Sequence, residues 1–517
     1  MSDRRETSSH FTGHRRSKQG CQPCRRRKKK CDEVRPTCAG CARNGLVCQW
    51  SSAVVCSYGQ KLRPRKKTRR HPSRGPQAIP GLMGMLSVFA APNTQTLNRL
   101  FSHFTECGPL WMSIGPGRRQ NCFLSQLVPT ALQSPPVLSC IFAAAAADLA
   151  KYNSGEEDWE ILALEMHSRA LAEVNSAVRE EVTADPTSAV QGGSEALLLA
   201  VLLLCFHEAH NFSDNSRLIP HLNAAAILCR RCIQQPSASP EMRQFLVDLF
   251  CYFFALTSFT HGSSLLQEAA AQVFALALEE SRHGEILLLG PGQRLLWIIS
   301  RVSRLSTSIP TSASEGHTWR LELLALERDL QQCSVPDSAV DAGLPFTGDG
   351  GSTPTRRNDI GASSDHIIIY TLYRLACLLY VKKALDPHTP LQFPDVHEIT
   401  LAFIAQLDLL PESSPANGVL GWPLVVVGLC SVNDAHQRAI LARLRSIYRT
   451  WRSDIFRRNF EFLQAHWRGL RGYTDTRSKE SHCACQATGC GRGGACCATG
   501  RLGHFTFQSL GLPTILV

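Results

Sequence analysis

The feature that most constrains this chain of 517 residues is a cysteine pattern that occurs twice near its N-terminus. In each copy, two residues separate the first cysteine from the second, and six separate the second from the third. The pattern comprises Cys21, Cys24, Cys31, Cys38, Cys41 and Cys48. Two cysteines with two residues between them can place both thiolates on one metal ion, and a helical turn after each pair brings the third cysteine back to that ion. The repeat therefore predicts one metal site built from two similar halves.

The number of thiolates predicts how many ions this site holds. Two separate tetrahedral Zn²⁺ ions need eight sulfur contacts, and six thiolates supply eight only if two of them bridge both ions. We therefore expect two Zn²⁺ ions per chain, with an excess of negative charge that neighbouring Lys and Arg side chains would stabilise. Six unconnected structural cysteines would match this spacing only by chance. A metal-storage site or a RING-type site fits less well, because histidine ligands are absent and RING spacings are longer.

The positive charge of the chain is concentrated around these cysteines. Residues 1–74 hold 21 Lys and Arg against 4 Asp and Glu, a formal charge of +17, whereas the chain as a whole carries +12. The remaining residues are therefore slightly acidic. Such asymmetry predicts a polyanionic partner at the N-terminal end, either nucleic acid or an anionic membrane surface.

The segment CQPCRRRKKKCDEVRPTCAGCARNGLVC resembles the cluster of the fungal Zn(II)2Cys6 transcription factors. The likeness includes every cysteine spacing, the basic run before Cys31, Asp32 after it, and Arg35 with Pro36 in the connecting loop. It implies a zinc-dependent regulator that binds double-stranded DNA sequence-specifically in the nucleus and controls RNA polymerase II genes. Control of a single pathway or gene cluster is one option.

Six consecutive cations lie between Cys24 and Cys31 on what we expect to be one short helix. A solvated basic face is the alternative interpretation. However, such a high density of cations beside a zinc cluster favours contact with phosphates and a DNA groove. The resemblance implies that Lys28 reads bases in a CGG-type triplet, with Arg27 as the next candidate. Lys and Arg match the guanine acceptors in the major groove. The predicted DNA contacts are Arg25, Arg26, Arg27, Lys28, Lys29, Lys30 and Arg43.

Composition and periodicity divide the chain further. From about residue 95 apolar residues recur at spacings of three and four, as between residues 161 and 178, and alternating strand-like patterns are scarce. We expect a small binuclear zinc cluster of two short, metal-held helices, followed by a large all-α regulatory domain. The predicted segments are a disordered basic arm (1–18), the cluster (19–50), a basic linker (51–94), the all-α domain (95–471) with a flexible loop (335–364), and a Cys/Gly-rich disordered tail (472–517).

The helical region also resembles the fungal-specific transcription factor domain that follows such clusters. The segments that carry the likeness are LNRLFSHF, CIFAAAAADLA, EALLLAVLLLCFHEAH and WPLVVVGLC. The resemblance implies a regulatory role, with transcription machinery or co-regulators as partners. No sustained heptad pattern occurs between Cys48 and Arg99, so monomeric binding and a homodimer formed through the helical domain both stay open.

A second basic run covers residues 61–74. It can serve as a nuclear-import signal, as a second phosphate-binding arm, or as a solvated spacer, and the first two roles are compatible. The cations that we assign to nuclear import are Arg65, Lys66, Lys67, Arg69 and Arg70.

Other signals argue against a membrane protein or an enzyme. The apolar runs at 197–206 and 249–259 are shorter than the roughly 18–20 residues that span a bilayer, so no membrane partner is expected. No G-x-S-x-G, P-loop or H-E-x-x-H motif occurs, and we interpret His207 and His210 as hydrogen-bonded helix-end residues. The tail cysteines match no zinc module. The scattered cysteines are expected in the core; examples are Cys140, Cys205, Cys251 and Cys377.

Overall fold

The computed structural model describes two parts of the chain, which divides into the units Met1–Thr68 and Arg69–Val517. In the first unit it describes residues 23, 24, 27, 29, 31, 32, 37–44 and 46. In the second it describes residues 94–477 except 113–121, 153–157, 184–192, 212–216, 235–238, 281–291, 308–311, 333–356 and 387–392. The expected arm at 1–18, most of the linker and most of the tail lie outside these residues.

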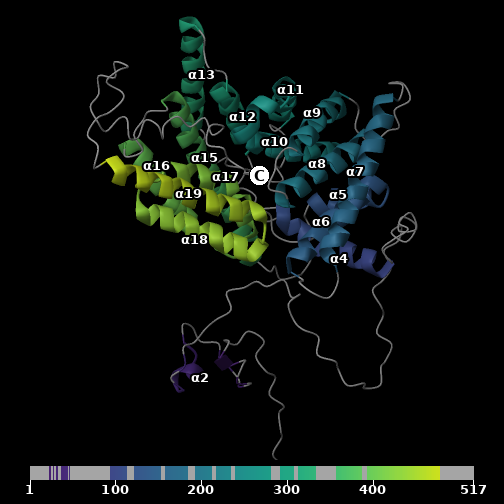
Figure 1. Cartoon of the computed structure of the whole chain (residues 1–517), viewed down its shortest axis with the longest axis horizontal. Coiled ribbons are helices and arrows are strands. Elements are labelled where there is room, and N and C mark those ends of the chain that lie inside the picture. The colour runs from purple at the N-terminus through teal and green to yellow at the C-terminus, as the bar shows by residue number, and fades with distance from the viewer. Residues whose placement is uncertain are drawn as a thin grey trace, which may run out of the picture. The chain divides into compact units, whose positions relative to one another are not determined.

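The second unit is built from α-helices and short 3-10 turns, and its described residues contain no strand (Figure 1). This confirms the expected large all-α domain. The helices are α4 (Thr94–Met112), α5 (Cys122–Ala131), α6 (Pro135–Tyr152), α7 (Trp159–Thr183), α8 (Gly193–Asn211), α9 (Leu218–Gln234), α10 (Pro240–His261), α11 (Gln267–Glu280), α12 (Gln293–Thr307), α13 (Ala313–Gln332), α15 (Arg357–Leu385), α16 (Pro394–Leu409), α17 (Gly421–Leu429), α18 (Asp434–Trp451) and α19 (Asp454–Arg477), with the 3-10 turns η2 (Gly262–Ser264) and η3 (Pro415–Val419).

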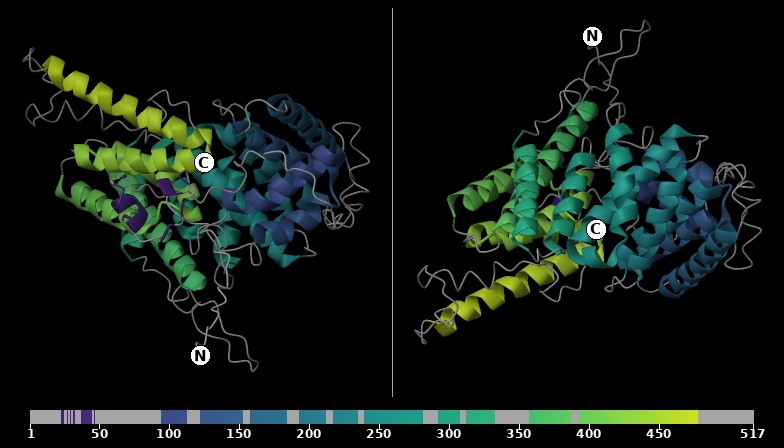
Figure 2. Two further views of the ribbon diagram at one scale, coloured as in Figure 1. Left: turned by 90° about the horizontal axis from the view of Figure 1, so that it is seen from below. Right: turned by 90° about the horizontal axis from the view of Figure 1, so that it is seen from above.

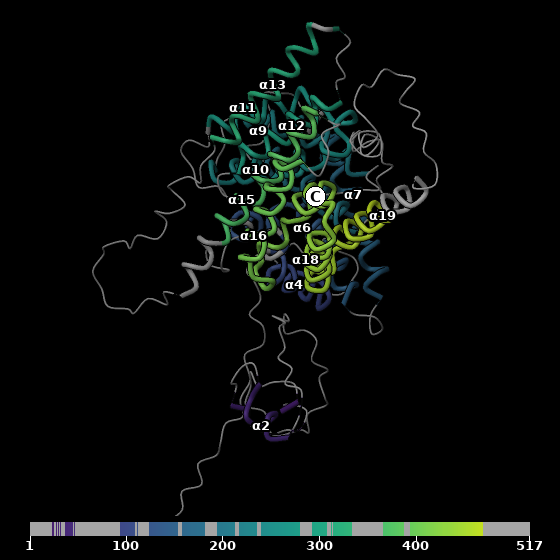
Figure 3. The backbone as a smooth tube through the Cα atoms, turned by 90° about the vertical axis from the view of Figure 1, so that its left-hand side faces the viewer, coloured from purple at the N-terminus to yellow at the C-terminus, as the bar shows by residue number. Residues whose placement is uncertain are grey.

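The helices of this unit form two sides. Helices α4–α9 gather on one side and α15–α19 on the other, with α10 and α12 between them (Figures 1 and 2). Figure 3 looks onto the side formed by α15, α16 and α18. Residues 143–147 of α6 are five alanines, and their small side chains let α6 pack along α7. Helices that are neighbours in sequence, such as α6 with α7 and α8 with α9, therefore pack against each other, and the central helices join the two sides.

Helix α10 lies at the centre of the core. It begins at Pro240, which suits the first turn of a helix, and the Ser239 hydroxyl accepts a hydrogen bond from the Met242 amide at 3.2 Å. Of its 22 residues, 17 are buried. The expected core cysteines share this apolar interior, since Cys140, Cys205, Cys251 and Cys377 are all at most 1% exposed.

One described segment, Pro240–Ser264, is long and apolar enough to cross a membrane, with a mean hydropathy of 1.3. A second candidate arises only if α5 and α6, which are bent by 118°, count as one span. Inside the folded unit, however, 89% of the apolar window of Pro240–Ser264 is buried. Core helices surrounded by neighbours are apolar on all faces for this reason.

Two expected boundaries are wrong. The loop predicted at 335–364 ends earlier, because α15 already begins at Arg357. Gly361, Ser363 and Ser364 favoured a loop, but no proline follows Pro354 in this stretch, so the helix that packs in the core extends back through them. The expected tail at 472–517 likewise starts too early, since α19 continues to Arg477.

Candidate metal centre and nucleic-acid interface

Four of the six expected ligands lie together among the described residues. Cys24, Cys31, Cys38 and Cys41 are buried, with exposed fractions of 2%, 4%, 0% and 0%, although the residues around them are largely exposed. Cys21 and Cys48 lie outside the described residues. Within the described part of this unit, the buried apolar cluster consists of these four cysteines, which indicates that the thiol groups themselves organise it.

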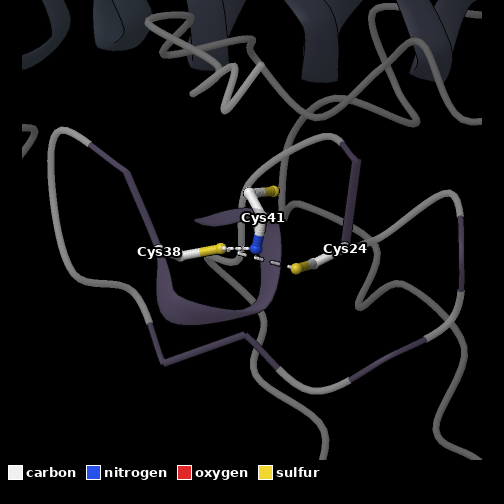
Figure 4. Close-up of side chains that lie close together, drawn as sticks. All are labelled: Cys24, Cys38 and Cys41. Atoms are coloured by element: carbon white, nitrogen blue, oxygen red, sulfur yellow. Dashed lines mark hydrogen bonds between the residues drawn. The ribbon is translucent and has the colours of Figure 1, made fainter. Parts of the chain in front are cut away.

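The sulfur atoms fit zinc coordination. Those of Cys24, Cys38 and Cys41 all lie within 4.8 Å of one another, and the Cys24 and Cys38 Sγ atoms are 3.6 Å apart (Figure 4). Two thiolates bound at about 2.3 Å to one tetrahedral zinc ion lie about 3.8 Å apart. The observed spacing therefore suits co-ligands of one ion.

Cys38 belongs to a second group of potential ligands. Its Sγ atom also lies within 4.8 Å of ligand atoms of Cys31 and Asp32. One thiolate thus takes part in both groups, which is the placement required of a bridging ligand. The expected mixture of terminal and bridging sulfurs is compatible with this arrangement.

Short helical turns position these cysteines. In the first half, the Arg27 amide donates to the Pro23 carbonyl at 3.0 Å, which closes a helical turn around Cys24. In the second half, helix α2 (Ala39–Ala42) begins after Cys38, whose Sγ accepts a hydrogen bond from the Cys41 amide at 3.3 Å. Amide donors directed at sulfur stabilise the thiolate that a metal requires.

Two residues outside the cysteine set hold the halves together. The Asp32 carboxylate follows Cys31 in the first half and accepts a hydrogen bond from the Ala39 amide, at the start of α2, at 2.9 Å. Gly40 lies on α2 where a Cβ atom would be 3.2 Å from the Cys24 sulfur. The sequence pattern included Asp32 but predicted no role for it, and it did not indicate Gly40. A glycine between two metal ligands is nevertheless a signal that the backbone approaches another group closely.

The described cations lie on the surface of the cluster. Arg27, Lys29 and Arg43 are exposed. The Arg27 guanidinium donates to the Asn44 side-chain oxygen at 3.0 Å and so joins the two halves, while Arg43 Nε donates to the Ala39 carbonyl at 3.3 Å. The other expected DNA contacts and import residues lie outside the described residues: Arg25, Arg26, Lys28, Lys30, Arg65, Lys66, Lys67, Arg69 and Arg70.

The helix-end histidines of the large domain are hydrogen-bonded, as expected. The His210 Nδ1 atom lies 3.0 Å from the Phe206 carbonyl, and the Asn211 amide nitrogen lies 3.5 Å from His207 Nδ1. Among the described residues, the groups arranged to hold a metal ion all contain the cluster cysteines.

Comparisons with known proteins identify a family domain in each of the two parts of the chain. Residues 19–54 match the model of the fungal Zn(2)-Cys(6) binuclear cluster domain. Residues 99–478 match the model of the fungal specific transcription factor domain, which therefore covers well over half of the chain. No solved structure matches the chain.

Individual relatives agree with these family models. The Zn(2)-C6 fungal-type transcription factor afumD of Aspergillus fumigatus is 32% identical over 152 residues, which are 28% of this chain and 35% of that protein. The transcriptional regulatory protein pro1 of Neurospora crassa is 43% identical over 53 residues, 10% of this chain and 8% of that protein. The matches thus span about a third of the first relative and under a tenth of the second. The chain has a zinc-cluster domain that carries a buried cysteine group, followed in the sequence by a domain whose described residues are helical, and it belongs to the fungal Zn(2)-C6 family of DNA-binding transcription factors.

Proposed function

We propose that this chain binds two Zn²⁺ ions through its six clustered cysteines and uses the helix after Cys24 to read a CGG-type triplet near RNA polymerase II genes. The observation that carries the proposal is the position of Cys38, whose sulfur lies in two ligand groups at once. A shared thiolate is what allows six sulfurs to fill two tetrahedra. Zinc here would supply structure, because so small a segment lacks an apolar core of its own.

Charge supports DNA as the partner of this cluster. Arg27, Lys29 and Arg43 are exposed on the small folded unit, and residues 1–74 carry a formal charge of +17. Lys and Arg that neutralise phosphates release counterions, which gives affinity for any DNA sequence. Contacts from one helix to base edges in the major groove would then add specificity.

Lys28 is expected to read bases, whereas the basic run at 61–74 is expected to supply mainly charge. Lys28→Ala should weaken the free energy of binding to a CGG-type duplex by on the order of 1–3 kcal/mol. It should also bring the affinities for matched and scrambled duplexes closer together. Fluorescence anisotropy titrations of the full chain against both duplexes measure this difference. Equal weakening on both duplexes would instead make Lys28 a phosphate contact.

The matched control for Lys28 is the joint replacement of the import cations by alanine. This linker variant should weaken matched and scrambled binding about equally and flatten the dependence of affinity on salt, because fewer counterions are released. The replaced residues are Arg65, Lys66, Lys67, Arg69 and Arg70.

Nuclear accumulation is expected to depend on the same basic run. In a fluorescent fusion of the full chain, the five-alanine linker variant should lose most of its nuclear signal, while Lys28→Ala should keep it. Fluorescence microscopy that shows an unchanged nuclear signal for the linker variant would assign import to another segment.

We propose a regulatory and not an enzymatic role for the helical domain, with co-regulators or the transcription machinery as its partners. The match of residues 99–478 to the fungal specific transcription factor domain supports this role. A homodimer formed through this domain is the proposed alternative to monomeric DNA binding, because the segment between Cys48 and Arg99 has no heptad pattern. Analytical ultracentrifugation of the full chain separates the two states.

A further inference from the structure

Helix α18 of the helical domain carries exposed arginines along one face. The four residues, which we call the arginine stripe, are Arg438, Arg445, Arg449 and the C-cap residue Arg452. At 3.6 residues per turn these positions lie within an arc of about 60°, and they extend over about 21 Å along the helix axis. Ile440, Leu444 and Ile447 are buried on the opposite face. Helix α18 lies on the outside of the domain, so the stripe faces solvent (Figures 1 and 3).

Carboxylates do not neutralise the stripe. Among the residues that the structure describes, none of its four guanidinium groups lies within 4.0 Å of a carboxylate oxygen. The acidic side chains nearby have other partners. On α19, both Asp454 and Glu461 pair with Arg457, each at 3.1 Å. The Glu412 carboxylate accepts a hydrogen bond from the Ser446 hydroxyl at 2.7 Å. The stripe is therefore a row of unpaired positive charges.

The electrostatics of the helix itself do not account for this row. A helix C-terminus favours cations in its last turn, which explains Arg449 and Arg452 but not the two arginines farther back. Arg445 and Arg449 are four residues apart, and like charges at this spacing destabilise a helix. Asp434, the one carboxylate of α18, lies in the first turn, before Arg438. A bound anion would relieve the repulsion that remains.

Aromatic rings hold two of the guanidinium groups in place. The Arg445 Cζ atom lies 5.1 Å from the centroid of the Phe460 ring on α19, and the Arg452 Cζ atom lies 5.7 Å from that of Tyr152 on α6. Both arginines stay exposed. A guanidinium that lies over a ring can still donate hydrogen bonds from its edge, and it loses less conformational freedom when it binds.

The chemistry of the stripe favours DNA over an acidic protein segment. Protein interfaces depend on large buried anchors, and none of the exposed large hydrophobic side chains belongs to α18. A DNA strand carries one phosphate about every 3.4 Å along the duplex axis, so about six phosphates face a stripe of this length. Guanidinium groups also match phosphate oxygens with paired hydrogen bonds.

We infer that the arginine stripe of the helical domain binds the phosphate backbone of duplex DNA. The inference rests on the proposed DNA binding for its choice of polyanion, and it adds a second surface to the zinc cluster. Because both parts belong to one chain, a duplex held by the cluster stays at a high effective concentration near the helical domain. Phosphate contacts carry no sequence information, so the stripe adds affinity and not specificity.

Anisotropy titrations of the full chain against a scrambled duplex at several salt concentrations test the stripe. The stripe variant combines Arg438→Gln, Arg445→Gln and Arg449→Gln and keeps Arg452, which ends α18. Each lost phosphate contact reduces the slope of log affinity against log salt concentration by about 0.9, so we expect a reduction of about two to three. The affinity at low salt should fall about tenfold. Circular dichroism checks that the variant is folded.

The charge-matched control removes three exposed arginines from α12 and α13, and its salt dependence should equal that of the wild type. It combines Arg294→Gln, Arg320→Gln and Arg328→Gln. Lysine at the three stripe positions keeps the charge and should keep most of the wild-type slope. If the stripe variant does not fold, Arg449→Gln alone decides, because it should reduce the slope by about 0.9.

The inference is overturned if the folded stripe variant keeps the wild-type salt slope, or if the control variant loses as much as the stripe variant. It is also overturned if the stripe variant binds DNA like the wild type but no longer binds fluorescent poly-L-glutamate, because the stripe would then be a surface for acidic proteins. Failure of the proposed CGG recognition is a separate result, since it shows as equal wild-type affinity for CGG-type and scrambled duplexes.

Discussion

Replacing Cys38 with serine is expected to remove both zinc and DNA binding from this chain. The Cys38 sulfur lies 3.6 Å from that of Cys24 and also belongs to the group formed with Cys31 and Asp32, so its loss opens both halves of the cluster. Metal binding and folding are coupled in small domains of this kind, and structural zinc contributes roughly 10–16 kcal/mol. Metal analysis of the purified variant should find less than one Zn²⁺ per chain, and anisotropy should find no preference for a CGG-type duplex.

The control for Cys38 is a buried cysteine of the helical domain. Cys107 lies on α4 and is 8% exposed, and Cys107→Ser should leave zinc content and DNA affinity unchanged. A Cys38→Ser protein that keeps two ions and wild-type DNA affinity would contradict the assignment of Cys38 as a shared ligand.

His167→Leu is expected to destabilise the helical domain by roughly 3–5 kcal/mol, because it leaves a buried carboxylate without its partner. His167 on α7 lies 2.8 Å from Glu208 on α8, and the two residues are 4% and 0% exposed. The second carboxyl oxygen of Glu208 has no hydrogen-bond partner, so the contact with His167 supplies the hydrogen bond of this buried group. Urea unfolding at neutral pH, monitored by circular dichroism, measures the decrease in the free energy of unfolding.

The double variant separates the contact between His167 and Glu208 from general packing. Replacing an entire buried pair with apolar residues is often nearly neutral, so adding Glu208→Leu to His167→Leu should restore most of the lost stability. His317 on α13 is exposed, and His317→Leu should change the free energy of unfolding by no more than about 0.5 kcal/mol. If the double variant is less stable than His167→Leu alone, the carboxylate does not depend on this histidine.

The zinc cluster was predictable from sequence because its determinants are local. The two-residue and six-residue spacings constrain where the chain can return, and the buried sulfurs of Cys24, Cys38 and Cys41 lie together accordingly. The contact from Asp32 to the Ala39 amide was not predictable, since it depends on how the two halves approach each other.

The helical domain was predictable in class but not in arrangement. Periodicity indicated helices such as α7, since apolar spacing of three and four residues places one face in the core. The contact of the Arg458 guanidinium with the Ala209 carbonyl at 2.9 Å could not be predicted, because these residues are far apart in sequence and meet only when the two sides of the domain pack. The early start of α15 was missed because local propensity at Gly361 opposed a helix that tertiary packing sustains.

The most direct test of the account is a titration of the full chain against a CGG-type duplex and a scrambled duplex, before chelation, after chelation, and after zinc is returned. We predict a clear preference for the CGG-type duplex with zinc bound, loss of that preference when the metal is removed, and its recovery with two Zn²⁺ ions per chain. Equal affinity for both duplexes with zinc bound, or a preference that survives complete removal of zinc, would contradict it.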